Sequence, residues 1–258
     1  MLLHEFDAEK NAILNPTTLF RPLPDFPEVI VSCFAWHTFE RMVINTKATP
    51  FYETSIANMT IRLYKATIQG VTIGFVNAYV GAAGCVGVFE DLVALGMKRL
   101  VLFGTCGILD ETIQPLSLII PTSSLRDEGT SYHYAPASDV IATNEHTRSI
   151  MEDTFQDLHI PYVTGRAWTT DAIYRETYEK VRLRKEQGAI CVDMECSAIA
   201  AWAKFRNINV CHFFYSADSL VGEKWVPGAL KNTSFLQEKD QIASIAITVA
   251  LNWIKKFN

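Results

Sequence analysis

Two acidic residues, far apart in the chain, stand where an acid–base reaction would need them. Glu195 begins a predicted helix and lies on its apolar face, so its carboxylate must bind either sugar hydroxyls or backbone amides at the helix start. Asp218 follows a predicted buried strand, where it is either a helix cap or a general acid that protonates a departing heterocycle. This pair suits cleavage of a sugar–heterocycle bond, which develops positive charge on the sugar and negative charge on the base.

Two glycine-containing segments add possible anion-binding groups. Gly81-Ala-Ala-Gly84 lies between a predicted strand and a predicted helix, where glycines let backbone amides approach an anion. Gly104-Thr-Cys-Gly107 follows another predicted strand, and the hydroxyl and amide of Thr105 suit a phosphate or sugar oxygen. A tight turn explains the glycines of either segment equally well.

The elements that would position these residues alternate along the chain. Buried strands are predicted at residues 29–33, 71–79, 100–103, 118–121 and 209–215, and helices after Gly84, near Met194 and from about Glu238. Several prolines make residues 1–28 irregular. The pattern predicts one three-layer α/β domain over residues 1–258, with ligands beyond the carboxyl ends of the strands. The last helix carries an apolar stripe of Ile242, Ile245, Val249, Trp253 and Ile254.

The composition argues against several classes of partner and site. A formal net charge of −5 argues against nucleic-acid and anionic-membrane partners, which call for dense basic patches. The six cysteines form no CxxC pair and lie mostly in apolar stretches, which predicts reduced thiols and a cytoplasmic protein. No cluster has metal-ligand spacing, no secretory signal is visible, and no apolar run reaches the roughly 20 residues of a membrane helix.

Four segments in order resemble the nucleoside phosphorylase superfamily, which contains uridine and purine nucleoside phosphorylases and the methylthioadenosine/adenosylhomocysteine and AMP nucleosidases. The segments are the two glycine segments, Arg126-Asp-Glu-Gly-Thr-Ser-Tyr-His-Tyr134 and Val192-Asp-Met-Glu-Cys-Ser-Ala198. The resemblance implies a three-layer α/β/α single domain with a mixed central sheet, no cofactor, and a homo-oligomer such as a dimer, trimer or hexamer. His4 is either part of a disordered terminus or a group that reaches a neighbouring subunit's site.

The resemblance also implies roles for individual residues. Glu195 would bind the ribose hydroxyls, and Asp218 would lie beside the base. Further substrate contacts would come from Met194, Gly107, Cys106, Tyr174 and His133, although His133 suits a loop core equally well. Phosphate would lie near Gly81, Gly84 and Thr105.

The segment Asp171-Ala-Ile-Tyr174 bears on the choice of base. It resembles the family segment that supplies a ring-stacking aromatic, but Ile173 stands where the aromatic is usual. Uracil-specific members follow this segment with a Gln and an Arg, where this chain has Thr177 and Glu179. Together with Asp218, this departure favours a purine.

The arginines that phosphorylases use for phosphate are missing. Leu102 and Met59 stand where arginines are usual, and Cys33-Phe-Ala-Trp-His37 replaces a Gly-Asp-Pro-x-x-Arg loop. Possible replacements, each equally a solvated surface charge, are Arg41, Arg62, Arg126 and His37. Phosphorolysis to free base and ribose 1-phosphate is slightly favoured, while a hydrolytic nucleosidase and a non-catalytic nucleoside-binding relative stay open.

Overall fold

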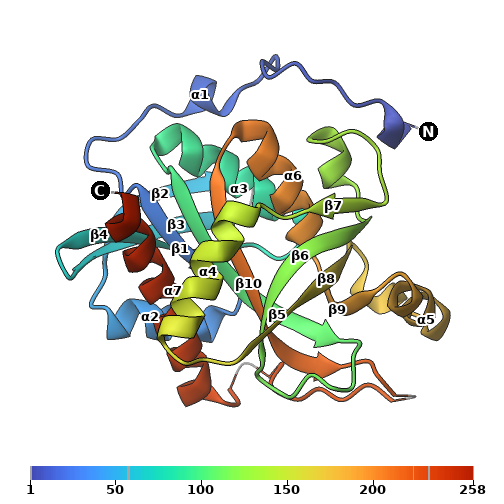
Figure 1. Ribbon diagram of the computed structural model, residues 1–258. Coiled ribbons are helices and arrows are strands. Elements are labelled where there is room, and N and C mark those ends of the chain that lie inside the picture. The colour runs from blue at the N-terminus through green and yellow to red at the C-terminus, as the bar shows by residue number, and fades with distance from the viewer. Residues whose placement is uncertain (1, 57–58, 223, 232, 258) are drawn as a thin grey trace.

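The fold is built on one mixed sheet of ten strands. The computed structural model describes residues 2–56, 59–222, 224–231 and 233–257 (Figure 1). The order across the sheet is β10-β6-β8-β9-β5-β1-β4-β3-β2, with β7 beside β6. The strands are β1 (Val29–Cys33), β2 (Thr49–Ile56), β3 (Met59–Ile68), β4 (Val71–Asn77), β5 (Arg99–Ile108), β6 (Leu118–Asp127), β7 (Val140–Ala142), β8 (Tyr162–Thr170), β9 (Ala189–Asp193) and β10 (Asn209–Ser219).

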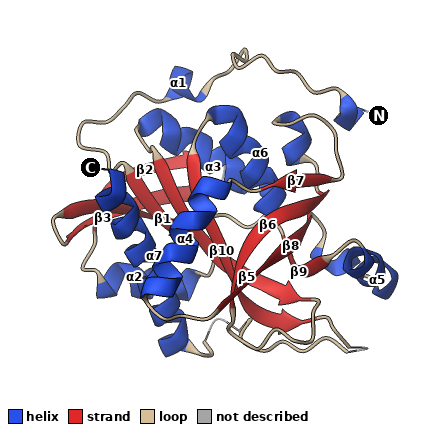
Figure 2. Cartoon of the chain, viewed as in Figure 1, coloured by secondary structure: helices blue, strands red, loops and turns tan. Residues whose placement is uncertain are grey.

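Helices cover both faces of this sheet, as Figure 2 shows. Helices α2, α4 and α7 pack on one face, and α3 and α6 pack on the other. The three-layer α/β/α domain predicted from the sequence is therefore confirmed. The helices are α1 (Pro16–Leu19), α2 (Trp36–Asn45), α3 (Ala82–Leu95), α4 (Glu145–Asp157), α5 (Tyr178–Glu186), α6 (Cys196–Arg206) and α7 (Leu236–Phe257).

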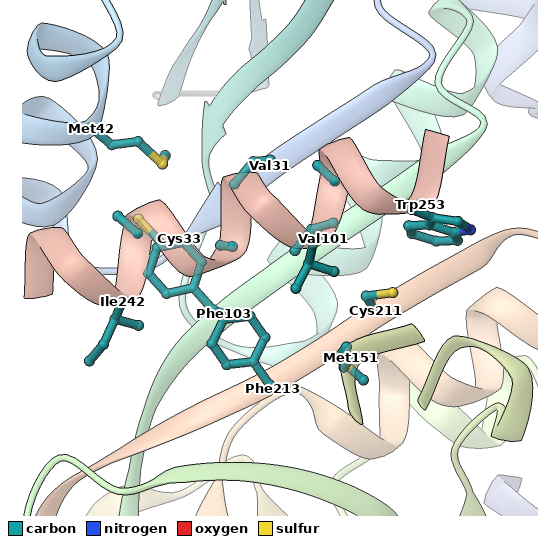
Figure 3. Close-up of a cluster of buried hydrophobic side chains, with 14 of the residues drawn as sticks. Val31, Cys33, Met42, Val101, Phe103, Met151, Cys211, Phe213, Ile242 and Trp253 are labelled. Carbon is teal, nitrogen blue, oxygen red and sulfur yellow. The ribbon is translucent and has the colours of Figure 1, made fainter. Parts of the chain in front are cut away.

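The long helix α7 forms much of the first core. Its side chains Ile242 and Trp253 pack over strands β1, β5 and β10, against Val31 and Phe213 among others (Figure 3). Side chains on strand β10 alternate between the two faces, because Cys211 and Phe213 belong to this core while Val210 belongs to the opposite one. The predicted apolar stripe of α7 is thus its buried face.

Five of the strands close into a ring. Strand β10 pairs with both β5 and β6, β6 pairs with β8, and β9 joins β8 to β5. The inside of the ring holds a small apolar core formed by Cys106, Ile108, Ile119, Ala167, Cys191 and Phe214, together with Cys196 at the start of α6. This ring fixes the ends of β5, β9 and β10 relative to one another.

Two expected loops are strand instead. Strand β5 continues through Gly104–Gly107, and β10 continues through Ser216–Ser219, because these stretches pair with each other in parallel, with a bulge between Ser216 and Asp218. The tight turn considered for Gly104–Gly107 is therefore wrong, and the two strands predicted to end at Phe103 and Tyr215 are longer. The hairpin of β2 and β3 and the strand β8 had no all-apolar run to reveal them, whereas β9 was missed although its Ala-Ile-Cys-Val stretch is apolar.

The N-terminal segment carries little regular structure. It contains a single 3₁₀ turn (Leu2–His4) and the four-residue helix α1 before β1 begins. In Figure 1 it runs along one side of the domain, across the ends of α3 and α6. No helix of the described residues is long and apolar enough to cross a membrane.

Candidate functional site

The candidate residues lie near the carboxyl ends of parallel strands. Strands β1, β4, β5 and β10 run in the same direction, so their carboxyl ends meet at one edge of the sheet. Gly81 follows β4, Thr105 and Gly107 lie near the end of β5, and Asp218 lies near the end of β10. Strand β9 runs antiparallel to β5 beside them and leads directly into Glu195. This is the edge at which α/β sheets bind ligands.

Glu195 is buried, with 6% of its surface exposed. Its Oε1 accepts a hydrogen bond of 2.6 Å from the backbone N–H of Gly81, immediately before α3. The backbone-amide partner considered from the sequence is therefore present, but it belongs to α3 rather than to the helix that Glu195 begins. Burial and the charge of Asp193 raise the pKa of Glu195 to about 8, against the opposing hydrogen bonds from Gly81 and Met194.

Asp193 holds the backbone that carries Glu195. Its Oδ2 accepts hydrogen bonds from the backbone N–H groups of Glu195 (2.8 Å) and Cys196 (2.7 Å), and its Oδ1 accepts one from Thr169 Oγ1 (2.7 Å). Burial raises the pKa of Asp193 to about 6, although these hydrogen bonds oppose the shift. Sequence reasoning missed this residue, although an Asp just before a predicted helix is a capping signal.

Asp218 lies within β10, so the helix-cap alternative is wrong. Its Oδ2 accepts a hydrogen bond of 2.7 Å from Trp225 Nε1. A Cβ atom added to Gly107 would lie 3.4 Å from Asp218 Oδ1 and 3.1 Å from Val192 Cγ1, so glycine lets these strands approach closely. Burial raises the pKa of Asp218, and the Trp225 hydrogen bond opposes that shift.

One short segment links the two acids. Before the 3₁₀ turn Ile173–Arg175, the charge of Asp171 contributes to the raised pKa of Glu195. After the turn, partly buried Glu176 has its pKa raised to about 7 by burial and by the charge of Asp218. Residues 171–176 therefore interact electrostatically with both acids, Asp171 with Glu195 and Glu176 with Asp218.

Glu176 was not singled out from the sequence, because its neighbours Thr177 and Glu179 occupied the positions compared with uracil-specific proteins. In the structure both neighbours have local roles. Thr177 caps α5 by accepting a hydrogen bond from the N–H of Lys180, and Glu179 pairs with Arg182 on the surface. The sequence did offer a signal for Glu176, because it is an acidic residue close to Tyr174 in the chain.

The expected phosphate region is closely packed. Leu102 is fully buried, and Phe34 lies so close to Gly104 that an added Cβ would be 2.7 Å from its ring. The Gly81 amide is already bonded to Glu195, Thr105 is partly buried, and Gly84 lies inside the first turn of α3.

The proposed replacements for the missing arginines all have other partners. Arg41 bonds Asp240 and Arg62 bonds Glu53. His37 lies 3.1 Å from Glu40. Arg126 lies near the end of β6, and its buried side chain donates to Ser131, to Ser138 and to the carbonyl oxygens of Ala135 and Pro136 in the loop that follows. None of the four is an unpaired cation.

The remaining candidates lie apart from these contacts. Tyr174 is 96% exposed, and His133 is exposed at the end of a 3₁₀ turn (Thr130–His133). Met194 is partly buried, while the Cys106 thiol is buried inside the strand ring, so Cys106 has only its backbone to offer a ligand. Their substrate contacts stay predictions. Among the described residues, no group of three or more His, Cys, Asp or Glu side chains is arranged to hold a metal ion.

Several known proteins are similar in sequence. A guanosine phosphorylase of Halorubrum lacusprofundi is 22% identical over 156 residues, which make up 59% of this chain and 63% of that protein. A purine nucleoside phosphorylase of DeoD type from Bacillus cytotoxicus is 22% identical over 195 residues, or 72% of this chain and 76% of the relative.

Solved structures show the same fold. A purine nucleoside phosphorylase from Toxoplasma gondii in complex with immucillin-H matches 88% of this chain and 92% of its own, with a TM-score of 0.73 and 18% identity. A uridine phosphorylase from Vibrio fischeri ES114 matches 93% and 98%, with a TM-score of 0.75 and 19% identity. The sequence model of the Phosphorylase superfamily matches residues 34–255. Since that match spans most of the chain and four ordered motifs lie within it, the chain belongs to the phosphorylase superfamily.

Proposed function

We propose that this protein cleaves the N-glycosidic bond of a purine nucleoside. The observation that carries the proposal is that residues 171–176 interact with two acids, buried Glu195 and partly buried Asp218, whose pKa values are both raised. Glu195 binds the ribose hydroxyls and stabilises the positive charge that develops on the sugar. The bond from C1′ to the ring nitrogen breaks, and its electron pair leaves with the base.

A proton from the Asp218 side of the site completes the departure of the base. Asp218 and Glu176 form a carboxyl pair in which the charge of one raises the pKa of the other. Such a pair retains a proton that is delivered to a purine ring nitrogen as negative charge develops there. The acids at these positions, and the absence of a Gln and an Arg for uracil, favour a purine over uracil.

Inorganic phosphate is our first candidate for the group that attacks C1′, giving free base and ribose 1-phosphate. The family and the purine phosphorylase relatives support it, with Gly81, Gly84 and Thr105 as the expected phosphate contacts. No cofactor takes part in this scheme.

Hydrolysis is the second candidate, and one set of observations favours it. Leu102 is buried, Phe34 packs against Gly104, and the neighbouring cations are paired with carboxylates or bound within a loop. Water needs no arginine, whereas phosphate without arginines loses its strongest hydrogen bonds. Water would then attack C1′ and give free ribose.

The experiment is base release from a panel of nucleosides, with and without phosphate. Inosine, guanosine, adenosine, uridine, methylthioadenosine and AMP are incubated with the protein, and bases and sugars are separated by chromatography. Release that requires phosphate supports phosphorolysis, and equal release without phosphate supports hydrolysis. If ligands raise the Tm but no base appears, the chain is a nucleoside-binding relative without catalysis.

The proposal also covers the location, the assembly and the partners of the protein. We expect a cytoplasmic homo-oligomer with small-molecule partners only, supported by family membership and by exposed apolar side chains at Ile13, Leu14 and Leu19 on the N-terminal segment. Light scattering of the purified protein measures the subunit number directly, and a monomeric mass at working concentrations would contradict the expectation.

A further inference from the structure

A cavity lies away from the candidate site. It has a volume of about 370 Å³ and is walled by α4, α6 and the first half of β10. Asp218 lies near the opposite end of β10, so the two locations are separated along this strand. The volume falls within the range of about 300–1,000 Å³ that is usual for small-molecule pockets.

The cavity follows from the way β10 pairs. Strand β10 pairs with β5 along its length, but with β6 only at Phe214 and Tyr215. Before Phe214 the two strands diverge, and Pro121 of β6, beside a bulge in the pairing with β8, lines the gap. The opening is therefore a consequence of how the strand ring closes, with α4 and α6 on either side of it.

His212 is the unusual residue of this cavity. It lines the cavity from β10 and is only 6% exposed, and neither ring nitrogen has a hydrogen-bond partner among the described residues. Burial lowers the pKa of His212 to about 3, so the ring is neutral and offers one donor and one acceptor. Buried polar groups without partners are rare because each has given up its hydrogen bonds to water, so this pair of nitrogens points to a missing partner.

The other lining side chains favour a flat molecule with a negative charge. Met151, Ile199 and Val210 provide apolar walls, and of the described residues that line the cavity none is acidic. Lys204 is exposed and forms no ion pair with any described residue. Arg148 lies 3.6 and 3.7 Å from the carboxylates of Glu145 and Glu152, longer than the roughly 2.7–2.9 Å of a strong charge-assisted hydrogen bond.

We propose that this cavity is a binding site for a small heteroaromatic acid. The ring lies between the apolar walls with its nitrogen toward His212, and the acidic group meets Lys204 and Arg148. The site is distinct from the nucleoside site, but it shares elements with it. Cys196, which lines the cavity, directly follows Glu195, and His212 lies on the strand that carries Asp218.

The test uses three probes of similar shape on the full chain. Quinoline-6-carboxylate has both the ring nitrogen and the charge, 2-naphthoate lacks the nitrogen, and quinoline lacks the charge. Calorimetric or NMR titration should give saturable binding of quinoline-6-carboxylate, with several-fold weaker binding of each of the other two. No saturable binding of any probe at millimolar concentration would overturn the proposal.

Variants locate the binding. Lys204→Ala should weaken binding of the two acids several-fold and leave quinoline unchanged, whereas Lys185→Ala, the matched lysine in the last turn of α5, should change nothing. Ala200→Phe should abolish binding of all three probes by filling the cavity. His212→Leu should remove the difference between quinoline-6-carboxylate and 2-naphthoate. Binding that is unchanged in both Lys204→Ala and Ala200→Phe lies elsewhere and contradicts the proposal, whether or not His212→Leu folds.

Discussion

Glu195 combines deep burial with a carboxylate that must ionise to accept bonds from ribose hydroxyls. Its pKa of about 8 lies above the ordinary Glu value of 4.5. Between these values the folded protein keeps a proton that the unfolded chain has released, so the free energy of unfolding falls as pH rises. Ribose hydroxyls that donate to the carboxylate offset this cost once substrate is bound. Ionisation of Glu195 therefore lowers the free energy of unfolding of the protein without substrate.

Replacing Glu195 with Gln should remove this pH dependence. The slope of unfolding free energy against pH, measured by urea denaturation from pH 5 to 8, should become shallower by up to about 1.4 kcal/mol per pH unit. Glu111→Gln, at an exposed position, is the control and should leave the slope unchanged. If Glu195→Gln and the control behave alike, Glu195 ionises normally in the folded protein.

The carboxyl pair of Glu176 and Asp218 predicts the pH at which base departure fails. The pair holds a proton up to about pH 7, the pKa of Glu176, so kcat should fall as pH rises above that value. Glu176→Gln removes the carboxyl that holds this proton and leaves Asp218 alone, so the fall in kcat should begin at lower pH.

The matched control for this change is Glu179→Gln, three residues further along the chain. Glu179 is exposed and pairs with Arg182, so its loss should leave the pH profile of kcat in place. A profile that stays the same in Glu176→Gln would show that Glu176 does not share the proton.

At the scale of elements, the start of α6 decides where Glu195 points. The Asp193 carboxylate accepts the N–H groups of Glu195 and Cys196, and Thr169 of β8 donates to the same carboxylate. Helix α3 completes the arrangement from the other side, because Gly81 precedes it with a φ of 97°, which favours glycine. Glu195 is thus fixed by three elements that are distant in sequence.

Asp193→Ala should lower stability by about 1–3 kcal/mol, because the α6 amides lose their acceptor inside the protein. It should also reduce kcat/KM, since Glu195 is no longer held. Asn144→Ala is the comparison, because Asn144 caps α4 in the same way by accepting from His146 and Thr147. That variant should cost about 1 kcal/mol and leave kcat/KM intact. Equal losses of kcat/KM in the two variants would contradict a specific positioning role for Asp193.

The elements also show where reasoning from the sequence succeeded. The all-apolar strand β1 and the striped helix α7 were predictable because burial on one or both faces leaves a clear pattern. The extension of β5 through Gly104–Gly107 was not predictable from the sequence, because it depends on pairing with β10. The glycines alone suggest a turn. Glu176 was missed for the same reason, since its importance comes from Asp218, which is remote in the chain. Asp193 was missed although its capping position before α6 is a local signal.

Over the whole molecule, stability is concentrated in the sheet and its helical layers. Residues 7–14 are exposed, Phe6 contacts Phe205 edge-on at 6.3 Å between ring centres, and the Lys10 carbonyl accepts a hydrogen bond from Arg206. Deleting residues 1–14 should therefore change the free energy of unfolding by less than about 2 kcal/mol. Phe26→Ala, at a buried position beside Phe51 and Gly96, should cost about 3–5 kcal/mol. Urea denaturation of both variants checks the contrast, and a deletion that costs more than Phe26→Ala would show that the N-terminal segment is part of the core.

The whole account depends on a proton donor beside the base, and the rate of base release in Asp218→Asn tests this most directly. The initial rate with the best nucleoside of the panel is compared with wild type and with Asp157→Asn, an exposed residue at the end of α4. We predict that kcat falls by about 10²–10⁴-fold in Asp218→Asn while the control keeps the wild-type rate. A wild-type rate in Asp218→Asn would contradict the account.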